Sequence, residues 1–512
     1  MTIFSKEFRS RYILFGVCLI VLLGATLAPF GGDVIGMDSS AYIYVAKQVL
    51  AGRHAYLDAL DHKGPFLYLI DAAGMFLAGG NFVGIWVLEL LALSTAAVSI
   101  HKLLLLYFPA RQSLLGTISA LLFLCPVLNG GNVTEEWALP FICATTYFCA
   151  RSVKNGLALS RAQLALIGVS FTLVLLIKLT LVAAWGGLWI AVLLKTLQSE
   201  KADAPAGAGE LVAREWVPAL SASAFAALAA ALAFLPFLVY FLLTRTLGDF
   251  WYGAFYFNLF EYKFTATGGG TLLWFLKKNT VLFALPLTGC LLFAFSRKDR
   301  GGAISLGLFF SVCACLVGGT FSYYLIICAP FFAIGFAHLF AIAGNLSERF
   351  APVTGSVLVA AAFLFINAVY FPYETRNLLR NYSDLEFQPS RCRFVPNERR
   401  AKMARIREIV ESNTTPADKI LVRGYASYIY LHTRRECAGA FPYPLINSSR
   451  VQQDYATGAA KLLPKLILQG TGVQSTADMV SLGALLSEKY RPLPTGYPDV
   501  EAWLLSPEGG KQ

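Results

Sequence analysis

Two charged side chains stand in the loop that follows the first apolar segment, residues 31–65. Asp38 precedes an amphipathic stretch, residues 39–51, and Lys63 comes directly before a Gly-Pro pair. A carboxylate can take a proton from a substrate as a general base, and a lysine can bind a phosphate as a point charge. Spacing alone favours a structural role for both residues, because an Asp before a helix is most often a cap and an interfacial lysine usually extends its ammonium towards water.

Further charged side chains occur at two other points between apolar segments. Glu135 and Glu136 are adjacent carboxylates at the predicted start of a helix, in segment 129–136, where capping competes with acid–base chemistry. Lys178 is enclosed by apolar sequence, Leu-Leu-Ile-Lys-Leu-Thr-Leu, so it is either a functional lysine or one that reaches the membrane surface. A shared site would need acids from two loops at one membrane face.

An aromatic segment, residues 249–264, reads Asp-Phe-Trp-Tyr-Gly-Ala-Phe-Tyr-Phe-Asn-Leu-Phe-Glu-Tyr-Lys-Phe. Aromatic residues at an interface usually form a membrane belt. The charged side chains between them, Asp249, Glu261 and Lys263, also permit a lid over a sugar or lipid head group. The pattern leaves both interpretations open.

The composition indicates an integral membrane protein. Of the 512 residues, 56% are hydrophobic and 14% are charged, whereas soluble domains average about 25% charged residues. The net charge of +11 does not indicate nucleic-acid binding, because Lys and Arg fall mainly in short loops between apolar segments, as the positive-inside rule predicts. The sequence contains no nucleotide-phosphate loop, no Asp-x-Asp sugar-nucleotide motif and no Cys/His metal spacing.

The apolar segments define the expected topology. We expect eleven membrane spans, near residues 12–30, 83–107, 113–128, 137–150, 162–178, 180–197, 217–244, 279–295, 302–320, 323–343 and 353–371. The first is interpreted as an uncleaved helix, because its apolar run is longer than that of a signal peptide and no clear A-x-A site follows. Residues 65–78 are shorter and are predicted to lie in the interface or to re-enter, since counting them as a span would break the positive-inside pattern in every later loop.

This topology divides the chain into two predicted domains. Residues 1–372 form the transmembrane domain, and residues 373–512 form a small α/β domain outside the cytoplasm, with a helix at 397–412 and a strand at 419–424. In that domain Cys392 and Cys437 would either form a disulfide or remain two buried thiols, and the sequence favours neither alternative. No internal repeat is evident, which argues against many transporter architectures.

In their order along the chain these features resemble the GT-C fold membrane glycosyltransferases that use polyprenyl-phosphate sugars. That group includes the protein O-mannosyltransferase-like enzymes, the lipid A aminoarabinose transferase and the rhizobial lipopolysaccharide galacturonosyltransferases. The resemblance covers roughly residues 10–345. The residues that carry it are Asp38 with Tyr42, Lys63-Gly64-Pro65, Glu135-Glu136, Lys178, the aromatic segment and Phe321-Ser322-Tyr323-Tyr324. Two positions depart from the family pattern, Ser39 and His62, where acidic residues are usual.

The resemblance implies a role for each of these residues. Asp38 would be the general base that deprotonates the acceptor. Lys63 would hold the donor phosphate, with Lys178 as a second cation, and a second acid would fall on Glu135 or Glu136. The residues expected to form a lid over donor or acceptor are Tyr42, Asp249, Tyr256, Glu261, Lys263, Tyr323 and Tyr324.

The implied reaction is one displacement at the anomeric carbon, which inverts its configuration, with polyprenyl phosphate as the leaving group. The expected partners are the lipid-linked sugar donor, a glycan, lipid or protein acceptor, and membrane lipids. The expected location is the inner (plasma) membrane, with the C-terminal domain periplasmic or extracellular. No firm cofactor is implied, and although the family leaves room for a divalent metal, the residues do not indicate one. The alternative function is a polytopic transporter or lipid flippase, although apart from Glu89 and Lys178 the spans are nearly free of charge.

Overall fold

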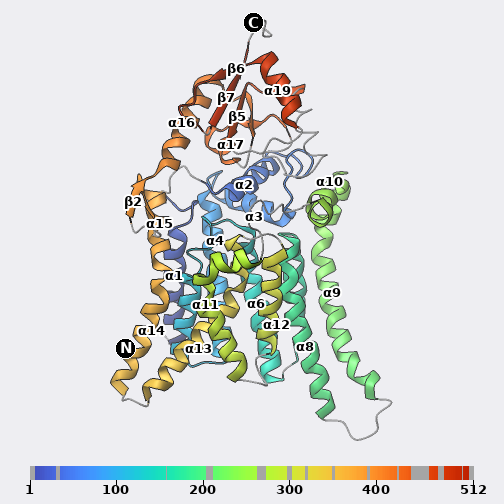
Figure 1. Ribbon diagram of the computed structural model, residues 1–512. Helices are drawn as coiled ribbons and strands as arrows, with labels where there is room; N and C mark the ends of the chain where they lie inside the picture. The colour runs from blue at the N-terminus through green and yellow to red at the C-terminus, as the bar shows by residue number, and fades with distance from the viewer. Residues whose placement is uncertain are drawn as a thin grey trace.

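The computed structural model describes residues 6–29, 35–156, 158–202, 211–261, 272–296, 302–317, 321–348, 352–388, 393–423, 426–439, 461–470, 478–498 and 500–506. They form a bundle of long helices with a small sheet above one end of it (Figure 1). Two short helices and their loops lie between the bundle and the sheet, and these carry the first part of the candidate site.

In the described part of the chain, each of the eleven predicted apolar segments overlaps one helix of 13 to 33 residues. These helices are α1 (Lys6–Leu23), α4 (Val83–Leu105), α5 (Ala110–Leu122), α6 (Thr134–Asn155), α7 (Arg161–Leu175), α8 (Ala183–Ala202), α9 (Leu211–Leu243), α11 (Leu272–Ser296), α12 (Gly302–Val317), α13 (Ala329–Glu348) and α14 (Pro352–Ala368). Four helical stretches among the described residues are long and apolar enough to cross a membrane. A fifth is added if the end of α14 and α15 (Phe371–Tyr382), bent by 47°, form one span. These helices support a multi-pass membrane protein, and crossing by all eleven stays a prediction.

Several helices approach each other where glycine leaves no side chain between them. Gly289 of α11 lies against the backbone of Gly335 in α13, and Gly187 of α8 lies against the carbonyl of Leu306 in α12, with no room for a Cβ at either position. In lipid, where the hydrophobic effect does not drive helices together, such close backbone packing is a main source of association. The bundle is therefore a tightly packed scaffold for the loops at its end.

The short helices above the bundle are α2 (Met37–Leu50) and α3 (Pro65–Leu77). The 13 residues of α3 rise by about 1.5 Å each, which is short for a hydrocarbon core of about 30 Å; α5 has the same number of residues, so length alone does not separate the two. Its start is pinned to the end of α7, because the amide of Gly64 donates to the carbonyl of Ile177 and that of Phe66 donates to Leu176. This supports the interfacial prediction for residues 65–78, and it places Lys63 beside Lys178.

Shorter helical segments connect the long helices on the same side. They are the 3-10 helices η1 (Leu179–Val182) and η3 (Ser322–Cys328), the short helix α10 (Leu247–Trp251) and the π-helix η2 (Tyr252–Glu261). A π-helix is uncommon and often accompanies a functional site. The aromatic segment predicted from the sequence is therefore helical over its described part.

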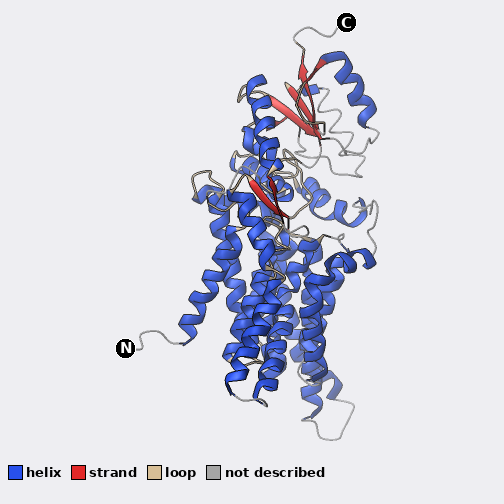
Figure 2. Ribbon diagram, turned by 60° about the vertical axis from the view of Figure 1, so that its left-hand side comes forward, coloured by secondary structure: helices blue, strands red, loops and turns tan. Residues whose placement is uncertain are grey.

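The C-terminal part contains strands, red in Figure 2, that form a mixed five-stranded sheet. Their order is β4-β3-β5-β7-β6. Its elements are α16 (Glu398–Asn413), β3 (Lys419–Arg423), α17 (Tyr428–Thr433), β4 (Glu436–Cys437), β5 (Leu466–Gly470), α19 (Asp478–Lys489), β6 (Tyr490–Leu493) and β7 (Val500–Leu505), preceded by the hairpin β1 (Leu385–Gln388) and β2 (Arg393–Pro396). Strand β3 is parallel to β4 and β5, and β7 is antiparallel to β5 and β6. The predicted helix and strand are thus confirmed, and the domain boundary at 372/373 stays a prediction. Cys437 is buried in this sheet, and Cys392 lies outside the described residues.

The C-terminal sheet domain rests directly on α2. Arg53, just after α2, forms a 2.8 Å ion pair with Glu436, and the amide of Cys437 donates to the hydroxyl of Tyr44, 2.9 Å away. The ring of Tyr44 also packs on Tyr430 of α17, with 5.2 Å between the ring centroids. Helix α2 is therefore held between the bundle and the C-terminal domain.

Candidate active site

Asp38 lies in the first turn of α2 and is half-buried. The N-cap position is occupied by Gly36, and no side chain caps this helix, so Asp38 is not the cap that its spacing favoured. Its Oδ2 accepts a hydrogen bond from the hydroxyl of Tyr323 in η3, at 3.1 Å. A residue from late in the chain thus holds a carboxylate of the first loop.

Tyr42 lies one turn further along α2 and is buried. The Nζ of Lys63 stands 5.7 Å from the centroid of its ring, within the range of a cation–π contact. Burial, and then the charge of Asp38, raises the pKa of the Tyr42 phenol, so the phenol stays neutral. Tyr42 is therefore a neutral polar group close to the charges of both Asp38 and Lys63.

Lys63 ends a short chain of polar groups. Its Nζ donates to Nε2 of His62 at 2.6 Å, and Nδ1 of His62 is 3.3 Å from Oδ1 of the fully buried Asp61. The hydroxyl of Tyr68 donates to the other oxygen of Asp61, at 3.0 Å. Burial lowers the pKa of both His62 and Lys63, and Asp61 opposes the change in each. A neutral His62 can thus accept a hydrogen bond from a charged Lys63.

Lys178 is ion-paired within the protein. Its Nζ is 2.7 Å from Oε1 of Glu135, whose side chain is fully buried, and the hydroxyl of Thr134 donates to the other oxygen of Glu135 at 2.7 Å. The same Nζ lies 4.0 Å from the ring centroid of Tyr324, which packs edge-on against Tyr323. The alternative of a lysine reaching for water does not hold, because the ammonium is directed to a buried carboxylate.

These contacts bring most of the predicted residues together. The charges of Asp61, Lys178, Asp38 and Glu135 all act on Lys63. The predicted residues within this cluster are Asp38, Tyr42, Lys63, Glu135, Lys178, Tyr323 and Tyr324. They come from four separate parts of the chain and converge beside the start of α2.

Glu136 points to a different place from Glu135. It is buried beside Glu89 of α4 and interacts with that residue, away from Lys178. Of the two acids that the sequence offered, Glu135 is therefore the one within the cluster. Among the described residues, no group of three or more His, Cys, Asp or Glu side chains is arranged to hold a metal ion.

The aromatic segment contacts the cluster through a residue that the sequence did not single out. Asn258 of η2 donates to the carbonyl of His62 at 2.7 Å, and Phe257 packs on the His62 ring at 5.5 Å. Two lid residues predicted within this segment have other surroundings: Tyr256 is 41% exposed, and Glu261 accepts from Tyr252 within the segment itself.

The two remaining lid residues predicted in this segment stay predictions. Asp249 is half-buried in the first turn of α10, and Lys263 lies outside the described residues. The described part of the segment thus supports His62 and Lys63 through η2.

A second set of contacts, which the sequence did not indicate, holds the start of α2 in place; we call it the brace. The side-chain amide of Asn132 donates to Ser39 at 3.0 Å and to Asp71 of α3 at 3.2 Å. Its oxygen accepts from the indole of Trp137 at 2.7 Å, and its backbone amide donates to Glu89. Asn132 is fully buried, so it joins α2, α3, α4 and α6 next to Asp38.

The loop that carries Asn132 has an unusual backbone. Four successive residues adopt positive φ, Asn129 (52°), Gly130 (97°), Gly131 (83°) and Asn132 (51°). Asn and Gly are the residues that enter this region most readily. The sequence Asn-Gly-Gly-Asn was the signal that could have revealed this brace.

We expect Asn132→Gly to weaken transfer and to destabilise the protein. Glycine tolerates the left-handed backbone, so the substitution removes only the three side-chain hydrogen bonds, each contributing about 0.5–1.5 kcal/mol. The apparent melting temperature and the turnover number should both fall. Asn129→Gly is the matched control, because Asn129 has nearly the same φ and an exposed side chain. Equal melting temperatures and rates in the two variants would show that the Asn132 side chain braces nothing.

The lowered pKa of Lys63 predicts an alkaline limit to activity. Because only the ammonium stabilises an anion, transfer should decline as pH rises through a pKa below that of an ordinary lysine. Asp61 raises the pKa of Lys63 more than any other group, so Asp61→Asn should move this decline to lower pH. The measurement is kcat/KM against pH for both proteins. A decline at the same pH in Asp61→Asn would assign it to another group.

Solved structures with the same fold were found by structural comparison. ArnT from Cupriavidus metallidurans in the apo state aligns with a TM-score of 0.60 at 13% identity, covering 96% of this chain and 97% of ArnT. ArnT bound to undecaprenyl phosphate aligns with a TM-score of 0.59 at 13% identity, covering 98% and 99%. The archaeal oligosaccharyltransferase AglB from Archaeoglobus fulgidus, in complex with an inhibitory peptide and a dolichol-phosphate, aligns with a TM-score of 0.51 at 12% identity, covering 98% and 75%.

No family model matches the sequence, and a comparison with curated proteins finds no match. At 12–13% identity the structural likeness concerns the fold. The chain shares the GT-C fold of ArnT and AglB. The fold expected from the resemblance is thereby confirmed, and the roles of individual residues stay proposals.

Proposed function

We propose that this protein transfers a sugar from a polyprenyl-phosphate donor to an acceptor hydroxyl, with inversion at the anomeric carbon. The observation that carries the proposal is the convergence of a half-buried carboxylate, Asp38, and a half-buried ammonium, Lys63, beside the ring of Tyr42. Such a pair supplies the two groups that a displacement of phosphate needs, a base for the nucleophile and a cation for the leaving group.

The reaction is written as a single displacement. The acceptor oxygen attacks the anomeric carbon while the bond from this carbon to the phosphate oxygen breaks. Asp38 takes the proton of the acceptor hydroxyl, and polyprenyl phosphate leaves with the bonding electrons. Lys63 stabilises the charge on the departing phosphate. Phosphate is a good leaving group, so no general acid is required.

The surrounding residues have supporting roles. The hydroxyl of Tyr323 holds Asp38, which leaves its second oxygen for the substrate. Lys178 is neutralised by Glu135, so it adds less to phosphate binding than Lys63. Their ion pair positions Tyr324 and, through it, Tyr323. We therefore assign the main phosphate contact to Lys63 alone.

Placement in the membrane follows from the same proposal. We infer that all eleven long helices cross the plasma membrane and that the site and the C-terminal domain lie on the extracytoplasmic face. The charge distribution between the apolar segments supports this orientation. The undecaprenyl phosphate bound to ArnT and the dolichol-phosphate bound to AglB support a lipid-phosphate donor, and the acceptor is a glycan, lipid or protein of the envelope.

The proposal is tested with the full chain in lipid nanodiscs. The protein is incubated with radiolabelled undecaprenyl-phosphate hexoses and pentoses and with envelope extracts as acceptors, and the anomeric configuration of the product is determined by NMR. We expect consumption of one donor and an inverted product. A product with retained configuration would contradict the single displacement. Movement of a lipid-linked sugar between leaflets without its consumption would favour the transporter alternative.

A further inference from the structure

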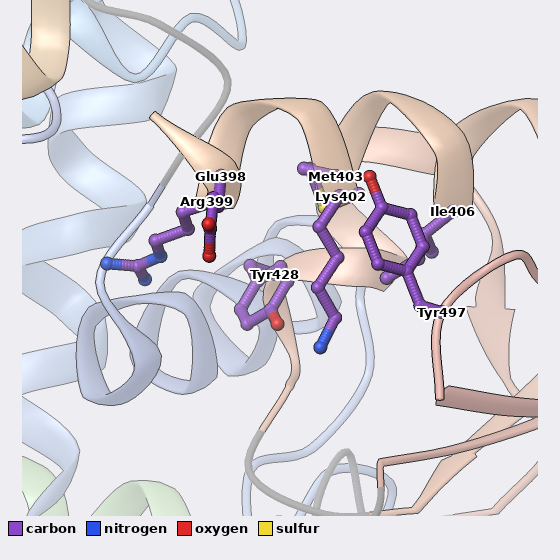
Figure 3. A pocket seen from close by; sticks show the side chains of 7 residues that line it. All are labelled: Glu398, Arg399, Lys402, Met403, Ile406, Tyr428 and Tyr497. Atoms are coloured by element: carbon purple, nitrogen blue, oxygen red, sulfur yellow. The ribbon is translucent and has the colours of Figure 1, made fainter. Parts of the chain in front are cut away.

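A group of three acids lies next to the start of α2, and all three are buried. The side chains of Asp71, Glu89 and Glu136 are no more than 2% exposed. They differ in this from the charged residues that line the half-open hollow beside α16, such as Glu398 and Arg399, which are exposed to water (Figure 3). Burying a charge is costly unless the charge is paired, so the protonation of the buried acids has structural consequences.

Glu89 of α4 and Glu136 of α6 lie against each other. Their carboxyl groups are close enough for a hydrogen bond between them. With both groups ionised, Oε2 of Glu89 and both oxygens of Glu136 would have no hydrogen-bond donor among the described residues. A proton on either carboxyl group supplies the missing donor, because a protonated carboxyl group donates through its O–H.

Within the described part of the chain, no Lys, Arg or His is among the groups that act most strongly on this pair. Glu136 is affected by Glu89 and by nearby backbone amides. Glu89 is affected by Glu136 and by the amide of Asn132. The third acid, Asp71, also acts on Glu89 and brings no positive charge. Two adjacent buried carboxylates without a cation repel each other, so one of them keeps a proton.

The pair also holds the loop that braces α2. The backbone amide of Asn132 donates to Oε1 of Glu89, and Gly131 leaves no room for a Cβ beside the same oxygen. The side chain of Asn132 in turn donates to Ser39, the residue after Asp38. An amide donor favours one negative charge on the pair, whereas burial and mutual repulsion oppose a second. One proton and one charge therefore fit these surroundings.

We propose that Glu89 and Glu136 share a single proton, and that this singly charged pair positions the proposed base, Asp38. The O–H of one carboxyl group donates to the carboxylate of the other, and the pair accepts from the amide of Asn132. Because the pair acts on Asp38 through Asn132 and Ser39, both acids are positioning residues. The effect on Asp38 rests on the proposed function, whereas the sharing of a proton rests on burial and contacts alone.

The shared proton is tested by infrared spectroscopy of the full chain in nanodiscs at neutral pH. Carboxylic acids and carboxylates absorb in separate bands, so the spectrum counts both forms. We expect the double variant Glu89→Gln/Glu136→Gln to lose one carboxylic acid and one carboxylate relative to the wild type. Loss of two carboxylates, or of two carboxylic acids, overturns the inference. Glu501→Gln is the matched control, because Glu501 is exposed on β7, and it should lose no carboxylic acid band.

The positioning role is tested with single variants, whose folding is checked by thermal unfolding. Glu136→Gln keeps a donor for Glu89 and should retain a turnover number close to that of the wild type. Glu136→Leu removes the donor and should lower the turnover number about tenfold, as expected for loss of a hydrogen bond to a charged group. Donor affinity should stay the same in both, because Lys63 is untouched.

Equal turnover numbers in Glu136→Gln and Glu136→Leu would overturn the inference, because two ionised carboxylates have no mutual hydrogen bond to lose. This comparison does not require the double variant to fold. The infrared count does not depend on transfer. One carboxylic acid and one carboxylate in a protein that transfers no sugar would support the shared proton and contradict the proposed function, so the two can fail separately.

Discussion

Asp38→Asn is expected to lower the rate of sugar transfer by about 10²–10⁴-fold, the usual contribution of a positioned general base. Asparagine has the same shape and can still accept the hydrogen bond of Tyr323 through its amide oxygen, but it cannot take a proton at neutral pH. Binding of undecaprenyl phosphate should be unchanged, because Lys63 is untouched. The measurements are initial rates at saturating donor and donor-lipid affinity for the same preparations.

The control for this variant is Asp384→Asn, since the side chain of Asp384 is 98% exposed. It should transfer sugar at the wild-type rate. Tyr323→Phe separates positioning from proton transfer. It keeps the carboxylate of Asp38 but removes the hydrogen bond that holds it, so the transfer rate should fall far less than in Asp38→Asn. A wild-type rate in Asp38→Asn would place the base on another residue. Glu135 would then be the next acid to replace, because it lies in the same cluster.

The fold could be predicted in large part because a membrane helix is encoded locally. Each long apolar run had to satisfy its backbone hydrogen bonds within itself, which in lipid only a helix or a closed barrel allows. The short α3 was distinguished from a span by its length and by the charge pattern of later loops. Local periodicity also predicted α16 and β3. Strand order in the C-terminal sheet could not be predicted, because it depends on pairing between distant segments.

Most residues of the site could be predicted from their types, but the contacts between them could not. Nothing in the spacing of Lys178 and Glu135 indicates that they form an ion pair, because they belong to different parts of the bundle. The same holds for Tyr323 and Asp38, which lie 285 residues apart. The cap interpretation of Asp38 was wrong because Gly36 begins the helix two residues earlier.

The brace around Asn132 illustrates what a local pattern can and cannot reveal. Asn-Gly-Gly-Asn indicated a turn, but the partners of Asn132 come from three other helices. Burial raises the pKa of Asp71, and the hydrogen bond from Asn132 lowers it. This hydrogen bond therefore stabilises a polar group within a buried region next to the proposed base. One carboxylate oxygen each of Asp71 and Glu89 has no N–H or hydroxyl donor among the described residues, so the network is satisfied only in part.

Lys63→Gln is expected to lower the turnover number by about 10²–10³-fold, the cost of removing one group that stabilises developing negative charge. The donor should also bind more weakly, because its phosphate loses the cation. Stability should fall less than on breaking a direct ion pair, because Lys63 contacts His62 rather than Asp61 and Asp61 keeps its contact with His62. Lys47→Gln is the matched control, because Lys47 is an exposed lysine on α2. Rates and melting temperatures are measured for each.

Lys178→Gln should behave in the opposite way, and the contrast tests which lysine holds the phosphate. Removing Lys178 leaves Glu135 as an unpaired buried charge, which typically destabilises a protein by about 3–5 kcal/mol. The double variant Lys178→Gln/Glu135→Gln should regain much of this stability and retain more activity than Lys63→Gln. If instead the stable double variant is as inactive as Lys63→Gln, the ion pair itself acts on the substrate. The assignment of the phosphate contact to Lys63 alone would then be wrong.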